Sequence, residues 1–346
     1  MKTLQIKIGG RPVGDGYPCL VIAEIGSNHN HEFDRAIAMI DAAVDAGADA
    51  VKFQTFRADE HYSRKTPGFK YLDDADTHAL IKSLEIDRSW HRPLKEHAES
   101  RGVVFFSSPC DSEAIQELAA LDTAAYKIAS FDLPDLGLIK EMAEIGKPVL
   151  LSTGMADWGD IERAVAACRS VDNDQVVLLQ CTSLYPAPES LSNLAAMAAM
   201  RERFGVIAGY SDHTLGDEVA LASVALGSAV IEKHFTLDRS LPGPDHAFAI
   251  EPHELANMVE RIRHVESALG DGDKSGPRPE EQDMFEKGRR SLHARVAISR
   301  GQKITDDMLV VKRPGLGIPP FEQDGVVGRT AKADIEEDQW ITWDMI

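Results

Sequence analysis

The chain has 346 residues, 43% hydrophobic and 27% charged, which is the composition of a globular protein with room for one domain of about 250 residues and a smaller one. Its formal net charge of −19 argues against nucleic acid or an anionic membrane as a partner. No apolar run approaches the ~18 residues of a membrane span, and the first ten residues lack a signal-peptide core, which predicts a cytoplasmic protein. The four cysteines contain no CxxC pair, which indicates reduced, buried thiols.

Residues 1–17 are predicted to form a short hairpin around the turn Gly9-Gly10. Eight short β-rich runs follow and alternate with amphipathic helical runs, several of which end at a glycine. The eight runs are 20–25, 50–54, 103–107, 125–128, 149–152, 176–180, 206–209 and 229–233. Such near-continuous apolar strands alternating with helices predict a (β/α)8 barrel over residues 18–270. A doubly wound open sheet is the alternative, but it does not need eight equivalent units, and no G-x-G-x-x-G motif follows the first run.

Two segments depart from the alternation. Residues 57–83 form a polar insertion after the second run, which is either a lid over the catalytic face or a surface insertion. Residues 271–285, rich in Gly, Pro and charge, predict a linker. Residues 286–346 then carry short β-like runs broken by Gly and Pro, which predict a small, mostly β domain.

Polar side chains gather where the predicted strands end, and in a barrel these carboxyl ends meet at one face. The chemically useful ones are Glu24, Asn28, His29, Lys52, Gln54, Thr55, Ser107, Ser108, Lys127, Ser130, Asp132, Ser152, Thr153, Gln180, Thr182, Ser183, Tyr185, Ser211, Asp212, His213, Glu232, Lys233 and His234. Lysines with a ring of hydroxyls are suited to hold a phosphate, because they supply full positive charges and several short donors. Each hydroxyl taken alone is more often a strand cap.

His213 and His234 follow consecutive apolar runs at matching places, so the seventh and eighth strand ends would bring them together. Neutral imidazoles suit a divalent transition ion, and two of them leave coordination positions open for substrate and water. The alternative is that each histidine only makes hydrogen bonds within the rim of the barrel.

Motifs at these strand ends resemble those of the sialic acid synthase family. They are AEIGSNHN (23–30), ADAVKFQTF (48–56), YKIAS (126–130), STGMA (152–156), CTSLYPAP (181–188), GYSDHTLG (209–216) and IEKHFTLDRSLPGPDHA (231–247). Near the C-terminus, Arg290-Ser291-Leu292 and Val311-Lys312-Arg313-Pro314-Gly315 resemble the antifreeze-like (SAF) domain that follows the barrel in this family. The match runs over nearly the whole chain, with the motifs in the order of the family.

The resemblance implies a condensation of phosphoenolpyruvate with an open-chain 2-acetamido sugar, which gives a nine-carbon 2-keto acid and releases phosphate. It implies Mn²⁺ or Mg²⁺ on His213 and His234, with Glu24 as the essential acidic residue and Gln54 and Asp245 nearby. The residues similar to the phosphoenolpyruvate cradle are Lys52, Ser108, Lys127, Ser130, Ser152 and Ser211. Arg313 resembles the residue that reaches into the barrel of a neighbouring subunit to bind the N-acyl group, which implies a domain-swapped homodimer.

The residues expected at the sugar depart from the pattern of N-acetylneuraminate synthases. Phe131-Asp132 stands where Gly-Glu is usual, and Ser183 precedes Leu184-Tyr185 where Asn is usual. Phe131 and the CTSLYPAP form resemble the pseudaminic acid branch, whose substrate is a 2,4-diacetamido-trideoxyhexose. Asp132 is one methylene shorter than the Glu of both branches. The resemblance therefore leaves both N-acetylmannosamine and a deoxy diacetamido sugar as substrates.

Two other functions compete with this one. A class I aldolase would use a strand-end lysine as a Schiff-base nucleophile, but it needs a desolvated amine of lowered pKa, whereas Lys52 and Lys127 sharing an anion would stay charged. A carbohydrate-binding or ice-binding surface on the C-terminal domain would need a flat, regular apolar face, and residues 302–330 show charges and no such repeat.

Overall fold

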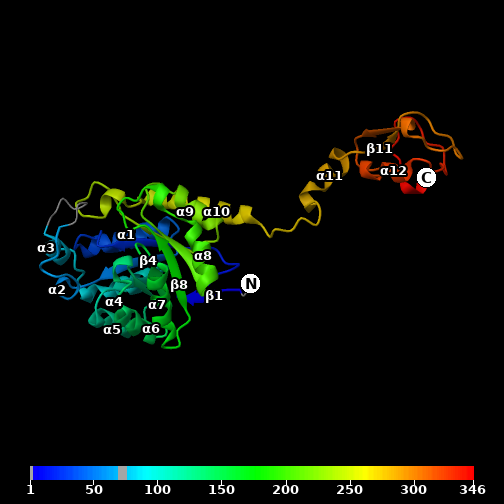
Figure 1. Cartoon of the computed structure of the whole chain (residues 1–346). Helices are drawn as coiled ribbons and strands as arrows, with labels where there is room; N and C mark the ends of the chain where they lie inside the picture. The colour runs from blue at the N-terminus through cyan, green and yellow to red at the C-terminus, as the bar shows by residue number, and fades with distance from the viewer. Residues whose placement is uncertain (1–2, 69–75) are drawn as a thin grey trace. The chain divides into compact units, whose positions relative to one another are not determined.

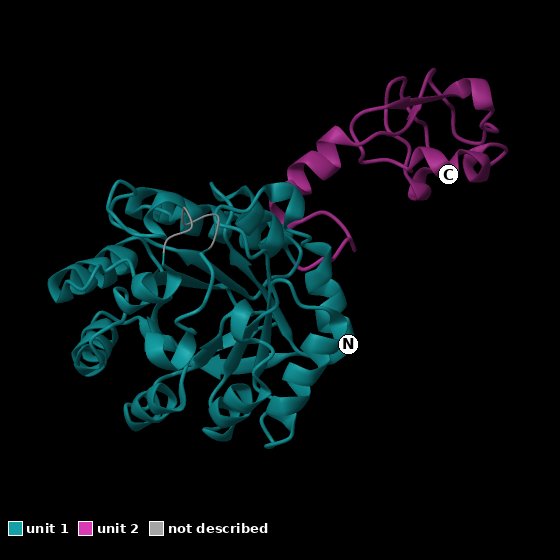
Figure 2. Ribbon diagram, turned by 60° about the vertical axis from the view of Figure 1, so that its left-hand side comes forward, with its two compact units in different colours: residues 1–270 teal, residues 271–346 magenta. Residues whose placement is uncertain are grey.

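The computed structural model describes residues 3–68 and 76–346. The chain divides into two compact units, residues 1–270 and 271–346 (Figure 2). Each unit has its own hydrophobic core.

The first unit is a closed barrel of eight parallel strands, in the order β10-β3-β4-β5-β6-β7-β8-β9. The strands are β3 (Leu20–Gly26), β4 (Ala50–Thr55), β5 (Val104–Pro109), β6 (Tyr126–Ile128), β7 (Val149–Ser152), β8 (Val176–Cys181), β9 (Ile207–Asp212) and β10 (Val230–His234). Because β10 pairs in register with β3, and His234 lies opposite Glu24, the sheet has no open edge. The predicted (β/α)8 barrel is confirmed, and the open doubly wound sheet is excluded.

Successive residues of each strand face opposite sides of the sheet. On β3, Val21, Ala23 and Ile25 belong to the core shared with the helices, whereas Leu20 and Ile22 belong to a second core inside the barrel. The same alternation holds on the other strands, and the inner core contains Leu20, Ile22, Ala50, Phe106, Ala125, Leu150, Val177, Leu179, Ile207 and Val230. The lower part of the barrel is therefore filled with apolar side chains.

Helices surround the barrel (Figure 1). They are α1 (Phe33–Asp45), α4 (His91–Ser100), α5 (Ser112–Ala120), α6 (Leu136–Glu144), α7 (Trp158–Arg169), α8 (Ala195–Phe204), α9 (Glu218–Ala225) and α10 (Pro252–Leu269). Aspartates cap the starts of three of them: Asp111, Asp135 and Asp157 each accept a hydrogen bond from a backbone N–H of the first turn. None of the helices in the described residues is both long and apolar enough to span a membrane.

An N-terminal hairpin closes the amino-terminal end of the barrel. Strand β1 (Gln5–Ile8) pairs antiparallel with β2 (Arg11–Gly14), and Ile8 and Val13 are fully buried in the inner core. Gly9 in the turn has φ +58°, and a Cβ there would come within 2.7 Å of a methyl group of Val104, so this turn needs glycine.

The insertion over residues 57–83 contains the short helices α2 (Ala58–His61) and α3 (Thr77–Lys82). Residues 69–75, the middle of the segment predicted to be a lid or a surface insertion, lie outside the described residues. The described part supplies His61, Tyr62, Leu80 and Ile81 to the wall of the main cavity, together with Leu84 just after it.

The second unit contains α11 (Gln282–Gly288), β11 (Ser291–Ala294), β12 (Leu309–Lys312) and α12 (Gln323–Val326). Strands β11 and β12 form an antiparallel pair around a core that includes Leu292, Ile304, Leu309 and Ile341. The segment 271–285 is not irregular throughout, because a 3₁₀ turn at Pro279–Glu281 and helix α11 begin inside it. Pro279 at the first helical position and the acidic residues that follow favour a helix start there.

Candidate active site

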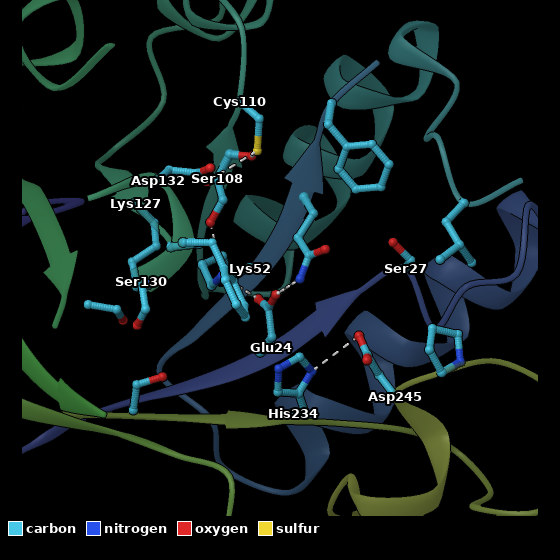
Figure 3. A pocket seen from close by; sticks show the side chains of 18 of the residues that line it. Glu24, Ser27, Lys52, Ser108, Cys110, Lys127, Ser130, Asp132, His234 and Asp245 are labelled. Atoms are coloured by element: carbon cyan, nitrogen blue, oxygen red, sulfur yellow. Dashed lines mark hydrogen bonds and ion pairs between the residues drawn. The ribbon is translucent and has the colours of Figure 1, made fainter. Parts of the chain in front are cut away.

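The inward-facing row of residues changes from apolar to polar near the carboxyl end of every strand. After Leu20 and Ile22 on β3 comes Glu24, and after Ala50 on β4 come Lys52 and Gln54. The inward positions of the other strands end with Ser108, Lys127, Ser152, Cys181, Ser211, Glu232 and His234. These side chains line a cavity of about 1080 Å³, counting the open solvent at its mouth (Figure 3).

Lys52 lies at the centre of this polar layer. Its Nζ is 2.9 Å from Glu24 Oε2, donates a hydrogen bond of 3.1 Å to Ser108 Oγ, and lies 3.7 Å from Glu232 Oε2. Gln54 Nε2 donates to the other oxygen of Glu24 at 2.8 Å. Glu24 and Lys52 are both buried, so this contact holds two opposite charges away from water.

Glu232 lies within ion-pair distance of both lysines. Its carboxylate is 3.7 Å from Lys52 Nζ and 3.6 Å from Lys127 Nζ, and it accepts a hydrogen bond of 3.2 Å from Ser211 Oγ. Lys127 Nζ also donates to the carbonyl of Ile128 at 3.0 Å. The predicted site residues did not include Glu232, although its position on β10 two residues before His234 puts it in the same inward row.

The pKa values follow from this burial and pairing. Burial raises the pKa of Glu24 to about 7, against the opposing effect of Lys52. Burial by itself would raise the pKa of Glu232, but Lys127 and Lys52 outweigh it and lower the pKa, so this carboxylate stays charged. Burial lowers the pKa of Lys127. For Lys52, burial is outweighed by Glu232 and Glu24, and its pKa is raised. The layer thus offers positive charge to an anion, with Glu24 poised between its two protonation states near neutral pH.

Serine hydroxyls surround the lysines. Ser130 Oγ accepts a hydrogen bond of 3.0 Å from the backbone N–H of Gly154, whereas the buried hydroxyls of Ser152 and Ser183 have no hydrogen-bond partner among the described residues. A Cβ at Gly154 would lie 2.3 Å from Ser183 Oγ and 2.8 Å from Ser130 Oγ, so glycine is needed where this backbone passes between the hydroxyls. Buried hydroxyls without partners are costly unless a ligand satisfies them.

His213 and His234 face each other with ring centroids 5.5 Å apart. His213 Nδ1 donates to the carbonyl of Thr182 at 2.8 Å, which leaves Nε2 as the ring atom available to a ligand. His234 Nδ1 is buried without a hydrogen-bond partner among the described residues and lies 3.7 Å from Asp245 Oδ2 (Figure 3). The ring centroids of Tyr185 and His213 are 4.4 Å apart.

This donor set fits a divalent cation. Burial lowers the pKa of His234 well below its ordinary value, so its ring is neutral, and burial raises the pKa of Asp245 to about 6. For His213, burial is outweighed by Cys181 and Thr182, and its pKa is raised, so a bound cation would displace a proton there. An unpartnered buried ring nitrogen beside a carboxylate is what a metal ion would satisfy.

The lining of the cavity also has an apolar part, formed by Phe56, Tyr62, Leu80, Ile81, Leu84 and Phe131. Asp132 lines the cavity as well. Its Oδ1 is 3.7 Å from His61 Nε2, and its Oδ2 accepts a weak hydrogen bond of 3.8 Å from Cys110 Sγ. Neither His61 nor Cys110 was among the predicted site residues.

The structure brings most of the predicted residues to this one cavity. Its lining includes Glu24, Lys52, Gln54, Ser108, Lys127, Ser130, Asp132, Ser152, Tyr185, Ser211, His213, His234 and Asp245. Ser183 packs behind it, against Gly154. Arg313 belongs to the second unit, where it is exposed and its Nε donates to the carbonyl of Gly288 at 2.6 Å.

Known proteins resemble this chain over most of its length. N,N'-diacetyllegionaminic acid synthase of Campylobacter jejuni is 38% identical over 93% of this chain and 98% of its own length. Pseudaminic acid synthase of Helicobacter pylori is 34% identical over 91% of this chain and 94% of its own length. The crystal structure of N-acetylneuraminic acid (sialic acid) synthetase from Leptospira borgpetersenii, in complex with citrate, superposes with a TM-score of 0.75 at 34% identity, over 82% of this chain and 96% of that one.

Family models match both units of the chain. The SAF domain matches residues 289–346, in agreement with the antifreeze-like domain expected from Arg290-Ser291-Leu292. The NeuB family model matches residues 39–274, from helix α1 to just beyond the end of the barrel. With its barrel, its lysine-lined cavity and its C-terminal SAF domain, the chain belongs to the NeuB family.

Proposed function

We propose that this protein is a nonulosonic acid synthase, which condenses phosphoenolpyruvate with an open-chain 2-acetamido sugar and releases inorganic phosphate. The observation that carries the proposal is the pair of buried lysines, Lys52 and Lys127, set beside Glu24 and the His213–His234 pair in one cavity. Relatives named as legionaminic and pseudaminic acid synthases support the class of reaction.

In the proposed reaction, C3 of phosphoenolpyruvate forms a bond with the aldehyde carbon of the sugar, and positive character develops at C2. The π bond of the aldehyde breaks, and its oxygen takes up a proton and becomes a hydroxyl. Water adds at C2, and the tetrahedral intermediate breaks its C–O bond to expel phosphate, leaving the 2-keto acid. The lysines neutralise the phosphate from binding to release, and the hydroxyls of Ser108, Ser152 and Ser211 orient it. Each of these groups is already in place before substrate binds, which lowers the cost of organising the transition state.

Glu24 is the group proposed to orient and deprotonate the water. Its pKa of about 7 suits a general base at neutral pH, and Gln54 and Lys52 fix the orientation of its carboxylate. His213 and His234 would hold Mn²⁺ or Mg²⁺, with Asp245 close by, and such an ion supplies Lewis-acid polarisation of a carbonyl oxygen.

For the sugar, we favour a 2,4-diacetamido-trideoxyhexose over N-acetylmannosamine. The cavity lining includes apolar side chains such as Leu80, Ile81 and Phe131, which suits a deoxy substrate that presents a methyl group. Relatives named for legionaminic and pseudaminic acid synthesis support this preference, whereas the sialic acid synthetase of similar identity supports N-acetylmannosamine.

The N-acyl end of the sugar is proposed to meet Arg313 of a second copy of the chain, which makes the working form a domain-swapped homodimer. Arg313 follows strand β12 and is exposed in its own unit. Because phosphoenolpyruvate is an intermediate of central metabolism, and the four cysteines are free thiols, the cytoplasm is the proposed compartment.

The test is an incubation with phosphoenolpyruvate, Mn²⁺ and a panel of N-acetylmannosamine and diacetamido sugars, with phosphate and the nine-carbon keto acid measured together. In water labelled with ¹⁸O, C–O cleavage puts the label at C2 of the product and leaves the phosphate unlabelled. Label in the phosphate, or phosphate release that does not require a sugar, would contradict the proposal.

A second function is favoured by one observation, the lowered pKa of the buried Lys127, which is the property of a Schiff-base lysine. A pyruvate aldolase of similar sugars would then be trapped by borohydride as a covalent adduct on Lys127 and would be indifferent to EDTA. Glu232 lies 3.6 Å from Lys127 and favours its charged form, which is why the synthase is preferred.

A further inference from the structure

Three side chains that could coordinate a metal ion lie close together in the cavity, away from the His213–His234 pair. They are His61 at the end of α2, Cys110 just after β5, and Asp132 in the 3₁₀ turn after β6. Their ligand atoms all lie within 4.8 Å of one another, and all three residues line the cavity. The mechanism proposed above uses neither His61 nor Cys110.

The spacing of these atoms suits a tetrahedral ion. With Zn–N and Zn–O bonds of about 2.1 Å and a Zn–S bond of about 2.3 Å, neighbouring ligand atoms of a tetrahedral site lie roughly 3.4–3.6 Å apart. The separation is 3.7 Å from His61 Nε2 to Asp132 Oδ1 and 3.8 Å from Cys110 Sγ to Asp132 Oδ2. These two distances end on different oxygens of Asp132, and one ligand atom from each of the three residues lies within 4.8 Å of the others. Side-chain rotations that shorten the separations by up to about 1.4 Å would therefore bring the three ligands to tetrahedral spacing.

The chemistry of the set selects a soft or borderline cation. Burial raises the pKa of the Cys110 thiol well above its ordinary value, so a bound ion would have to displace its proton. The resulting thiolate, with an imidazole and a carboxylate, would carry two negative charges and neutralise a divalent ion, and sulfur favours Zn²⁺ or Co²⁺ over Mg²⁺ and Mn²⁺. The nearby ammonium groups of Lys52 and Lys127 are themselves paired with Glu24 and Glu232, which limits their repulsion of a cation.

Neighbouring side chains contact the three residues, and the side that faces the cavity is open. The ring of His61 stacks on Phe56 and meets Tyr62 edge-on, with ring centroids 6.4 Å and 4.8 Å away. Asp132 and Cys110 already contact each other (Figure 3). Since all three side chains line the cavity, the fourth coordination position would face the cavity and take water or a ligand.

We propose that His61, Cys110 and Asp132 form a second metal site, which binds Zn²⁺-like cations and is separate from the His213–His234 pair. Nothing in this assignment depends on the synthase reaction, because it concerns only the binding of the ion. Three protein ligands and one open position is the arrangement of zinc sites that also bind water or substrate.

The experiment is a Co²⁺ titration of the full-length, metal-stripped protein with Mg²⁺ in excess, followed by the thiolate-to-cobalt charge-transfer band in the near ultraviolet. Cys110→Ser should abolish the band. Cys181→Ser is the matched control, because Cys181 Sγ lies 3.7 Å from His213 Nδ1 and is the other thiol able to give such a band in this cavity; this variant should keep it. His61→Gln should weaken Co²⁺ binding at least about tenfold, since even losing an outer partner of a ligand costs 10–100-fold.

Absence of the band at saturating Co²⁺ would overturn the proposal. So would a band that survives in Cys110→Ser and is lost in Cys181→Ser. If circular dichroism shows that Cys110→Ser is misfolded, cobalt X-ray absorption on the unmodified protein decides instead. One sulfur with nitrogen and oxygen neighbours, and Co²⁺ affinity reduced in His61→Gln, supports the site, and a shell without sulfur refutes it.

Discussion

The two halves of the barrel interior are built from the same inward-facing positions of the same strands, yet they differ completely in chemistry. Below, Leu20, Ile22 and Ile207 fill the interior together with Ile8 of the hairpin. Above, two or four residues further along each strand, the row becomes polar, as at Lys52. Strand periodicity therefore decides which residues face the interior. Position along the strand decides whether such a residue stabilises the fold or lines the ligand cavity.

The largest expected effect in the upper half comes from His234→Ala. We expect binding of Mn²⁺ to weaken by at least about 100-fold, because a ligand is lost outright rather than an outer partner. Turnover should fall to background and the unmodified protein should lose activity in EDTA. Calorimetric titration with Mn²⁺ and phosphate release are the measurements.

The control for that variant is His253→Ala on α10, whose side chain is 72% exposed. It should bind Mn²⁺ as the unmodified protein does. Near-normal, metal-dependent turnover in His234→Ala would refute the role given to the histidine pair.

Lys52→Met should reduce kcat/KM for phosphoenolpyruvate by about 10²–10³-fold, the typical cost of removing one preorganised electrostatic contact. The methionine keeps much of the volume but leaves Glu24 without its positive partner, so the pKa of Glu24 should rise further. Steady-state kinetics at several pH values measure both effects. The matched substitution is Lys140→Met at an exposed position of α6, and an equal loss there would mean that the effect of Lys52→Met is not local.

A substitution in the apolar lower half should reduce stability and leave activity nearly unchanged. Leu20→Ala removes a fully buried side chain at the start of β3 and should cost about 2–5 kcal/mol of unfolding free energy through lost burial and a residual cavity. Activity per folded molecule should stay within about twofold of normal, since the site lies above. Urea unfolding and active-site-normalised kinetics test this. A large loss of kcat with unchanged stability would mean that the two halves are not independent.

The smallest expected effect concerns pH. His91 at the start of α4 is buried, its Nε2 is 2.9 Å from Thr55 Oγ1, and burial lowers its pKa to about 4. The unfolded chain takes up a proton below about pH 6.5, whereas the folded protein does not until about pH 4, so stability falls as pH drops through this window. As the pH falls from 7 to 5, this histidine should lower the free energy of unfolding by about 2 kcal/mol.

His91→Gln keeps a side chain able to bond Thr55 but does not titrate. It should therefore lose less unfolding free energy than the unmodified protein between pH 7 and pH 5. Urea unfolding at the two pH values, followed by tryptophan fluorescence, gives the difference. Equal losses in both proteins would remove His91 from the acid response of the barrel.

The sequence was enough to predict the barrel and the residues at its mouth, because both depend on local patterns. Eight apolar runs gave the strands, and reading their ends gave residues such as Lys52, Lys127 and His234 that the structure brings to one cavity. The antifreeze-like domain followed from its resemblance motifs and agrees with the SAF match. The barrel could be predicted because its strand–helix unit repeats along the chain.

The remaining residues could not be identified from local patterns. Glu232 was noted at a strand end without a role, because its pairing with both lysines arises across the barrel. His61 comes from an insertion with no periodicity, and its approach to Asp132 joins positions 71 residues apart in the chain. The helix α11 was hidden in a segment whose Gly and Pro content is typical of linkers.

The hairpin of β1 and β2 has a consequence for how ligands enter and leave the barrel. Because Ile8 and Val13 fill the amino-terminal end of the barrel, the described residues leave the cavity around Lys52 and Lys127 accessible from the carboxyl ends of the strands, where His61 and Asp132 also line it. The side chains of Lys52 and Lys127 are 4% and 3% exposed, whereas those of His61 and Asp132 are 19% and 14% exposed, so the lysines lie deeper. We therefore expect an anion on the lysines to bind before a second molecule that contacts His61 and Asp132, and to leave after it.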